Sequence, residues 1–230
     1  MRSAADPPSP PLNLIGDYGG GGMLLAFGVL AAHLAALRTG RGQVVDAAMM
    51  DGTLQLMAPV FGWTNAGIWS AARETNFLDG SAPFYGTYRT ADGRFLAVGA
   101  IEARFYAAFR QALGLKDALF DAQMDKARWP AMRERIAAVV ASRTLEGWQD
   151  AIAIPDACLS PVLSCETAPD HPQVAARGAV LRDSDGSLRT APAPRLSGTP
   201  AVAARTGDLA RTLADWPLSP GLTDLLARRT

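Results

Sequence analysis

The chain has 230 residues, with 22 basic and 22 acidic side chains, so its formal net charge at pH 7 is zero. This balance excludes a general electrostatic attraction to nucleic acid or to anionic lipid. Hydrophobic residues make up 49% of the chain, which is enough for a sizeable core and argues against wholesale disorder. The two cysteines, Cys158 and Cys165, are too few for a disulfide scaffold, so a cytoplasmic location is expected.

The N-terminal part begins with a stretch rich in Pro and Ser, residues 1–12, which resembles a linker and has no apolar segment of a secretory signal. An apolar run then predicts a helix over 23–38. This run is shorter than the ~20 residues that a membrane span needs. We therefore expect a buried core helix and no membrane span, with His33 as a core histidine.

The middle of the chain carries the signal of a β-hairpin. Residues 84–99 alternate in polarity around the turn Asp92-Gly93, which predicts two strands, followed by a helix that begins near Glu102. The other expected elements are a strand at 43–48, helices at 49–60, 130–142, 145–152 and 221–229, a short strand at 162–163, and an extended tail at 186–206.

The stretch LIGDYGGGGM, residues 14–23, places one aspartate before four glycines. Asp17 could cap a helix, because aspartate is a favoured N-cap residue. No GxGxxG or Walker A pattern fits the stretch, so a phosphate cradle is poorly supported. The glycines would let a ligand approach the backbone, and a helix N-terminus favours developing negative charge. A carboxylate there could thus act on a carbonyl compound whose oxygen becomes an enolate, and these residues alone leave the alternatives open.

Five ordered stretches carry a resemblance to a known family. The chain resembles the family III CoA transferases, and within them the alpha-methylacyl-CoA racemases, from about residue 10 to about residue 200. The four glycines after Asp17 and the acid in GAIE favour the racemase branch. The stretches are PPLNLIGDYGGGGM at 10–23, TGRGQVVDAAMMDG at 39–52, NFLDGSAPFYGTY at 76–88, DGRFLAVGAIEARFY at 92–106 and DACLSPVL at 156–163.

The resemblance implies a reaction in fatty acid metabolism. The α proton of a 2-methylacyl-CoA thioester moves from one face to the other through an enolate, with acyl-CoA as the substrate and no cofactor or metal. Such chemistry needs a base on one face and an acid on the other. By resemblance, Asp17 is the acid/base of one face, and Glu102 supports a histidine on the other. Without the resemblance, Glu102 would be an acid in the first turn of a helix.

The chain departs from the family pattern at that histidine, which the family carries in a Gly-His-Asp stretch. No such stretch occurs here, and neither His33 nor His171 matches it. The candidate substrate-binding residues are Asn13, Gly19, Gly20 and Tyr85. Asn13 could also be a turn residue and Tyr85 a half-buried strand aromatic.

The resemblance also implies an architecture. We expect an α/β fold made of a partial Rossmann-like large domain and a small α+β domain, in an interlocked dimer. Residues 1–47 and 190–230 would belong to the large domain, 86–173 to the small domain, and 48–85 and 174–189 to linkers. The chain would then be a C-terminal portion of a racemase without the N-terminal CoA-binding region. A homodimer or partner chain would supply that half, and helix 23–38 would have lost much of its covering.

Two other functions stay open. One is CoA transfer, in which Asp17 attacks the thioester and carries the acyl group as an anhydride. The other is a non-catalytic fragment that associates with a homologous chain, which the missing histidine favours. Glu102 discriminates between racemase and transferase, because CoA transfer gives this residue no obvious role.

Overall fold

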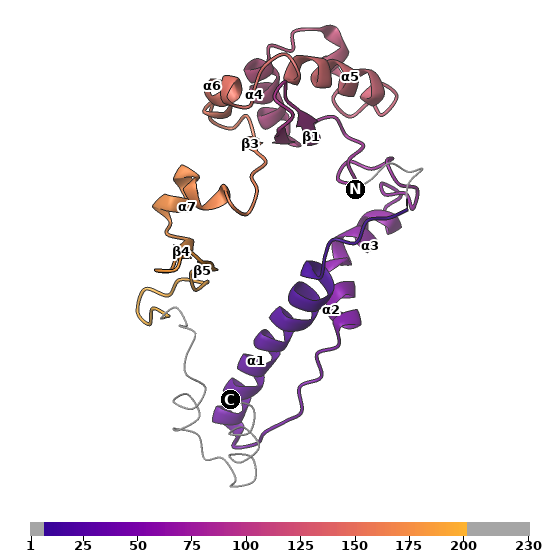
Figure 1. Cartoon of the computed structure of the whole chain (residues 1–230). Coiled ribbons are helices and arrows are strands. Elements are labelled where there is room, and N and C mark those ends of the chain that lie inside the picture. Colours follow the sequence, from indigo (N-terminus) through magenta and orange to yellow (C-terminus); the bar gives the residue numbers. More distant parts are fainter. Residues whose placement is uncertain (1–6, 202–230) are drawn as a thin grey trace. The chain divides into compact units, whose positions relative to one another are not determined.

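A computed structural model describes residues 7–201 of the chain (Figure 1). Contacts divide the chain into two compact units, Met1–Val162 and Leu163–Thr230. Helices mix with two small sheets, which confirms the expected mixed class. Both sheets of the described part are antiparallel. The predicted domain and linker boundaries stay a prediction.

The first unit opens with one long helical segment. A π-helix, η1 (Leu14–Met23), continues directly into α1 (Leu24–Thr39). The helix therefore begins nine residues earlier than the predicted residue 23, and it includes all four glycines. It ends at Gly40, whose φ of 69° is a left-handed conformation that glycine adopts without a steric penalty.

Two short helices follow, α2 (Met49–Leu56) and α3 (Ala58–Asn65). The strand predicted at 43–48 is wrong, because this segment has neither strand geometry nor a partner strand in the described structure. α2 packs against η1 through glycines. A Cβ atom added to Gly52 would overlap the carbonyl oxygen of Gly20, and one added to Gly20 would lie 2.9 Å from the Thr53 nitrogen. The two helix backbones are thus in direct contact.

The α1 helix has no buried residue. Phe27 and Leu37, for example, are 69% and 72% exposed. The prediction of a buried core helix is therefore wrong for the described structure, and His33 is exposed too. The prediction of a helix that lacks much of its covering is confirmed. By length and composition Leu14–Thr39 passes for a membrane span, with a mean hydropathy of 1.8, a test that signal sequences and core helices also pass.

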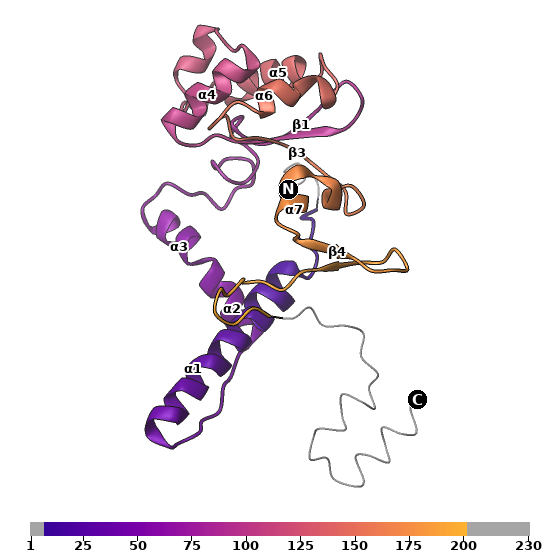
Figure 2. The same cartoon turned by 90° about the vertical axis from the view of Figure 1, so that its left-hand side faces the viewer.

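The second part of this unit is built on a three-stranded antiparallel sheet in the order β1-β2-β3. The predicted hairpin is confirmed, with β1 (Tyr85–Arg89) paired to β2 (Phe95–Gly99). The third strand, β3 (Leu159–Pro161), lies slightly before the predicted 162–163 and pairs with β2. Helices gather on one face of the sheet (Figure 2). They are α4 (Ala103–Leu113), η2 (Ala118–Asp121), α5 (Trp129–Val140), η3 (Glu146–Trp148) and α6 (Gln149–Ile152).

The hydrophobic core lies between this sheet and these helices. Phe84 stands edge-to-face against both Tyr106 and Trp129. The two buried tyrosines donate to backbone carbonyls, Tyr88 to Pro83 at 2.5 Å and Tyr106 to Phe120 at 3.0 Å. Burial raises the pKa of each tyrosine to about 12, so both remain neutral donors at any ordinary pH.

The second unit contains η4 (Ala168–Asp170), α7 (Pro172–Ala176) and a hairpin of β4 (Val180–Arg182) and β5 (Leu188–Thr190). The extended tail predicted at 186–206 is thus partly a strand. His171 caps α7, with its Nδ1 accepting from the Gln173 amide at 3.3 Å. The helix predicted at 221–229 lies outside the described residues.

The hairpin turn of the first sheet is held by one carboxylate. Asp92 accepts from the Thr90 hydroxyl at 2.5 Å and from the Leu145 amide at 3.2 Å, and it pairs with Arg94 at 2.7 Å. The hydrogen bond from Thr90, aided by the bonds from Arg94 and Leu145, lowers the pKa of Asp92 from 3.8 to about 2. The ionised form therefore ties the turn to the segment that begins η3.

Asp92→Asn should destabilise the fold in a pH-dependent way. The folded-state pKa lies below the unfolded value, so the stabilisation by Asp92 is complete above about pH 4 and is lost as the pH falls toward 2. Urea unfolding of both proteins should show the largest stability difference at neutral pH and a smaller one at pH 2. An equal difference at both pH values would contradict this account of the turn.

Gly52→Ala should weaken the packing of η1 on α2, because the added methyl group would overlap backbone rather than a movable side chain. Overpacking of this kind typically costs about 1–3 kcal/mol. The matched control is Gly62→Ala in α3, where an added Cβ meets nothing within 4 Å and alanine should stabilise the helix. Amide hydrogen exchange of η1 should accelerate in Gly52→Ala only. Unchanged exchange in that variant would refute the contact.

Candidate active site

Asp17 lies in the first turn of η1, and its side chain is exposed. The capping interpretation is wrong, because Asn13 occupies the N-cap position. The backbone carbonyl of Asn13 accepts from the amides of Asp17 and Tyr18, both at 3.2 Å. The Asp17 carboxylate has no hydrogen-bond partner within residues 7–201, and the residue is exposed near the helix start, where the helix dipole favours negative charge.

The glycines beside Asp17 have a packing role in the structure. Gly20 and Gly21 are buried, and a Cβ atom added to Gly21 would lie 3.1 Å from the Met49 side chain. Gly19 is similarly close to Leu56, at 3.3 Å. The contact with α2 therefore fixes the helix that presents Asp17. That Gly19, Gly20 and Asn13 bind substrate stays a prediction.

Glu102 occupies the N-cap position of α4, with extended backbone (φ −70°, ψ 144°). Its carbonyl accepts the Tyr106 amide at 2.9 Å, while its carboxylate makes no capping hydrogen bond. The side chain is exposed. The first-turn interpretation is therefore wrong by one position, because the first turn of α4 contains no acidic residue, and the Glu102 carboxylate does not cap the helix.

Cys158 lies close to Glu102 and was not singled out in the sequence. Burial raises the pKa of the Cys158 thiol, and the Asp156 and Glu102 carboxylates raise it further, against an opposing effect of Arg104. The thiol is thus neutral near pH 7 and unsuited to act as a thiolate nucleophile. Asp156 and Cys158 both have positive φ, 64° and 51°, which a sequence pattern does not reveal.

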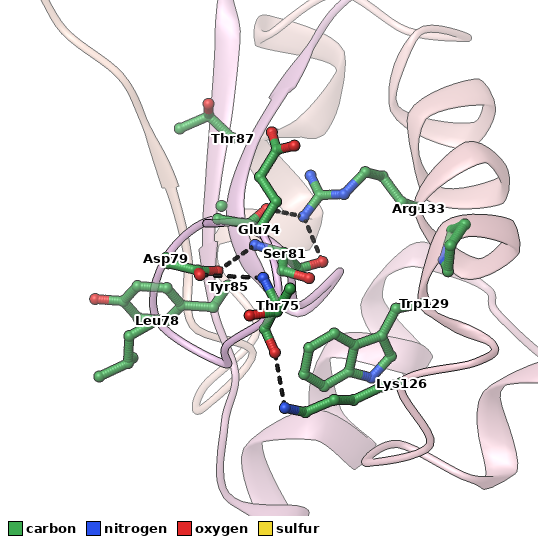
Figure 3. Close-up of a pocket in the computed structure, with 13 residues that line it drawn as sticks. Glu74, Thr75, Leu78, Asp79, Ser81, Tyr85, Thr87, Lys126, Trp129 and Arg133 are labelled. Atoms are coloured by element: carbon green, nitrogen blue, oxygen red, sulfur yellow. Dashed lines mark hydrogen bonds between the residues drawn. The ribbon is translucent and has the colours of Figure 1, made fainter. Parts of the chain in front are cut away.

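Tyr85 begins β1 and is 37% exposed. It lines a pocket of about 760 Å³ together with Leu78, Trp129, Lys126 and Arg133 (Figure 3). Both cations of the pocket are already bonded to backbone oxygens. Lys126 donates to the Thr75 carbonyl at 2.7 Å, and Arg133 donates to the carbonyls of residues 80–82. Of the predicted site residues, only Tyr85 lines this pocket.

A buried carboxylate organises the loop that enters β1. Asp79 accepts from the backbone amides of Thr75, Asn76 and Ser81, each at 3.1 Å, and from the Asn76 side chain at 2.9 Å. The NFLDGS stretch, residues 76–81, therefore has a structural role. Arg133 of α5 holds its end by hydrogen bonds to the carbonyls of residues 80–82. The Asp79-Gly80 dipeptide is a turn signal in the sequence, and the structure has a turn there.

The structure thus places the two predicted catalytic carboxylates on separate elements, Asp17 on η1 and Glu102 at the start of α4. Among residues 7–201, no hydrogen bond joins them. The same residues contain no group of three or more His, Cys, Asp or Glu side chains that could hold a metal ion. Neither carboxylate acts as a helix cap, so both side chains are available for chemistry.

Comparison with known proteins gives consistent relatives. The chain is 44% identical over 195 residues to the alpha-methylacyl-CoA racemase of Mus musculus and 42% identical to that of Homo sapiens. Each match covers 85% of this chain and 51% of the relative, so the chain spans about half the length of the curated relatives it matches. A Caenorhabditis elegans CaiB/baiF CoA-transferase family protein is 27% identical over 82% of the chain and 54% of that relative.

Solved structures share the fold. A CAIB/BAIF family protein from Brucella suis superposes with a TM-score of 0.63 at 23% identity, over 87% of this chain and 53% of that one. Rv3272 from Mycobacterium tuberculosis also gives 0.63, at 20% identity, over 86% of this chain and 53% of that one. The profile described as CoA-transferase family III matches residues 2–208. On these matches, the chain belongs to CoA-transferase family III.

Proposed function

We propose that the protein that carries this chain racemises 2-methylacyl-CoA thioesters at the α carbon. The observation that carries the proposal is the 44% and 42% identity to two alpha-methylacyl-CoA racemases over 85% of the chain. The match to the CoA-transferase family III profile, over residues 2–208, includes both Asp17 and Glu102. The reaction therefore belongs to the isomerases, and acyl-CoA is its substrate.

In this proposal, Asp17 removes or delivers the α proton on one face of the thioester. When its carboxylate takes the proton, the C–H electron pair moves into the carbonyl and forms an enolate. Reprotonation on the opposite face completes the inversion, and no oxidant or second substrate is needed. An exposed carboxylate without hydrogen-bond partners in residues 7–201 is free to bind and release a proton in this way.

Glu102 has the supporting role on the opposite face. Its carboxylate makes no capping bond at the start of α4, so it can accept a hydrogen bond from a base and stabilise the protonated form of that base. That base is the histidine of the family's Gly-His-Asp stretch, which neither His33 nor His171 of this chain matches. Two carboxylates with different tasks then serve the two faces of one enolate.

The remaining parts of the proposal concern substrate and setting. Asn13, Gly19, Gly20 and Tyr85 contact the acyl-CoA, and the protein works in the cytoplasm, in fatty acid metabolism, without a cofactor. It acts as a homodimer or with a partner chain. The exposed apolar surface of α1 supports such an assembly, because apolar patches of this kind mark interaction sites.

Asp17→Asn should slow racemisation strongly while leaving the fold intact. The amide keeps the size of the side chain but cannot act as a base, so the rate should fall by about 10²–10⁴-fold. Because the side chain is exposed and makes no hydrogen bond in residues 7–201, stability should change by less than about 0.5 kcal/mol. The measurement is loss of optical purity of a 2-methylacyl-CoA, made on the full-length protein. Full activity in a folded variant would remove Asp17 from the mechanism.

Glu102→Gln should act on one face only. Solvent deuterium should enter the α carbon of one epimer about 10²–10⁴-fold more slowly, while exchange on the Asp17 face continues. A CoA transferase would instead show no deuterium at the α carbon, and hydroxylamine would trap its acyl–Asp17 anhydride as a hydroxamate. Equal loss for both epimers in Glu102→Gln would contradict the division of labour between the two carboxylates.

A further inference from the structure

The segment of residues 99–102 runs from the last residue of β2, Gly99, to the N-cap residue of α4, Glu102. Neighbouring backbone holds its first half, since the Gly99 amide donates to the Cys158 carbonyl at 3.0 Å and the Ala100 amide to the Phe84 carbonyl at 2.9 Å. One side chain holds its second half. The amide nitrogen of Gln123 donates to the Ile101 carbonyl at 2.7 Å and to the Ala100 carbonyl at 3.3 Å.

Gln123 is itself fixed to the core. Its backbone carbonyl accepts from the indole of Trp129 at 2.8 Å, and Trp129 is only 2% exposed. Gln123 lies between η2 and α5, more than 20 residues from the carbonyls that it binds. Gln123 therefore links the buried core, through Trp129, to the peptide bond that directly precedes Glu102.

From these contacts we infer that Gln123 is a positioning residue for Glu102. The inference rests on the proposed function. Because the Glu102 carboxylate makes no capping bond, the backbone before it decides where this group stands. The Ile101 carbonyl belongs to the peptide that joins Ile101 to Glu102, so its hydrogen bond to Gln123 sets the orientation of that peptide. Loss of the bond frees the peptide to rotate and moves the carboxylate.

The consequence is a selective loss of rate. A misplacement of about 1 Å can cost about 10²-fold in a reaction that depends on geometry. Only the face that Glu102 serves should suffer, because η1 presents Asp17 through its own contact with α2. A purely structural role for Gln123 would instead lower activity on both faces together, in proportion to unfolding.

The test compares Gln123→Met with Arg110→Met in the full-length protein. Methionine has the length of glutamine but no N–H donor. Arg110 also donates from its side chain to a backbone carbonyl, that of Leu115 at 3.2 Å, but at the opposite end of α4. Both variants would be assayed for solvent deuterium entry into the α carbon of each 2-methylacyl-CoA epimer, and for urea unfolding.

Gln123→Met should slow exchange in one epimer by about 10- to 100-fold, the same epimer that Glu102→Gln slows. Exchange in the other epimer should stay within about twofold of the unmodified protein, as should both epimers in Arg110→Met. Equal rates, or equal losses, for the two epimers in Gln123→Met would overturn the inference while the proposed function stands. No exchange by the unmodified protein would overturn the proposed function and this inference with it.

Discussion

The contact between the backbones of Gly20 and Gly52 is the constraint on which the Asp17 side of the proposed site depends. Any side chain at Gly52 would overlap the Gly20 carbonyl, so η1 and α2 can meet only as bare backbone. That contact buries Gly20 and Gly21 within the same helix whose first turn carries Asp17. The glycine run therefore matters because it lets η1 and α2 come into contact. The Asp17 carboxylate lies on a part of η1 that this contact leaves exposed.

Glu102 is supported in a different way. The Gly99 and Ala100 amides before it donate to the Cys158 and Phe84 carbonyls, and the Gln123 side chain donates to the Ile101 carbonyl. The buried Trp129 in turn donates to the Gln123 carbonyl. The carboxylate is thus carried on rigid backbone without being used by the fold. The loop before Tyr85 is held in a similar way, because Asp79 accepts from three of its backbone amides and Arg133 donates to the carbonyls of residues 80–82. Such supporting shells determine how precisely a site can be held.

Much of the small sheet could be predicted from the sequence, because its signals are local. Alternation around Asp92-Gly93 determined the hairpin, and the acid at Glu102 marked the start of α4. The helical state of residues 14–23 could not be predicted, since four glycines have poor helix propensity and the long-range contact with α2 compensates for it. The strand predicted at 43–48 does not form, for the opposite reason. Val44 is 94% exposed, and a segment with β propensity but no partner strand forms no sheet. Arg133 and Gln123 were missed because their partners lie more than 20 residues away.

The most direct test of the account is the reaction of one pure epimer of a 2-methylacyl-CoA with the full-length, unmodified protein in deuterated water. The account predicts that the opposite epimer appears with one deuteron at its α carbon and that the thioester stays intact, because the enolate is reprotonated from solvent-exchanged groups. Transfer of CoA to a carboxylate acceptor, with the α proton retained and the configuration unchanged, would contradict it.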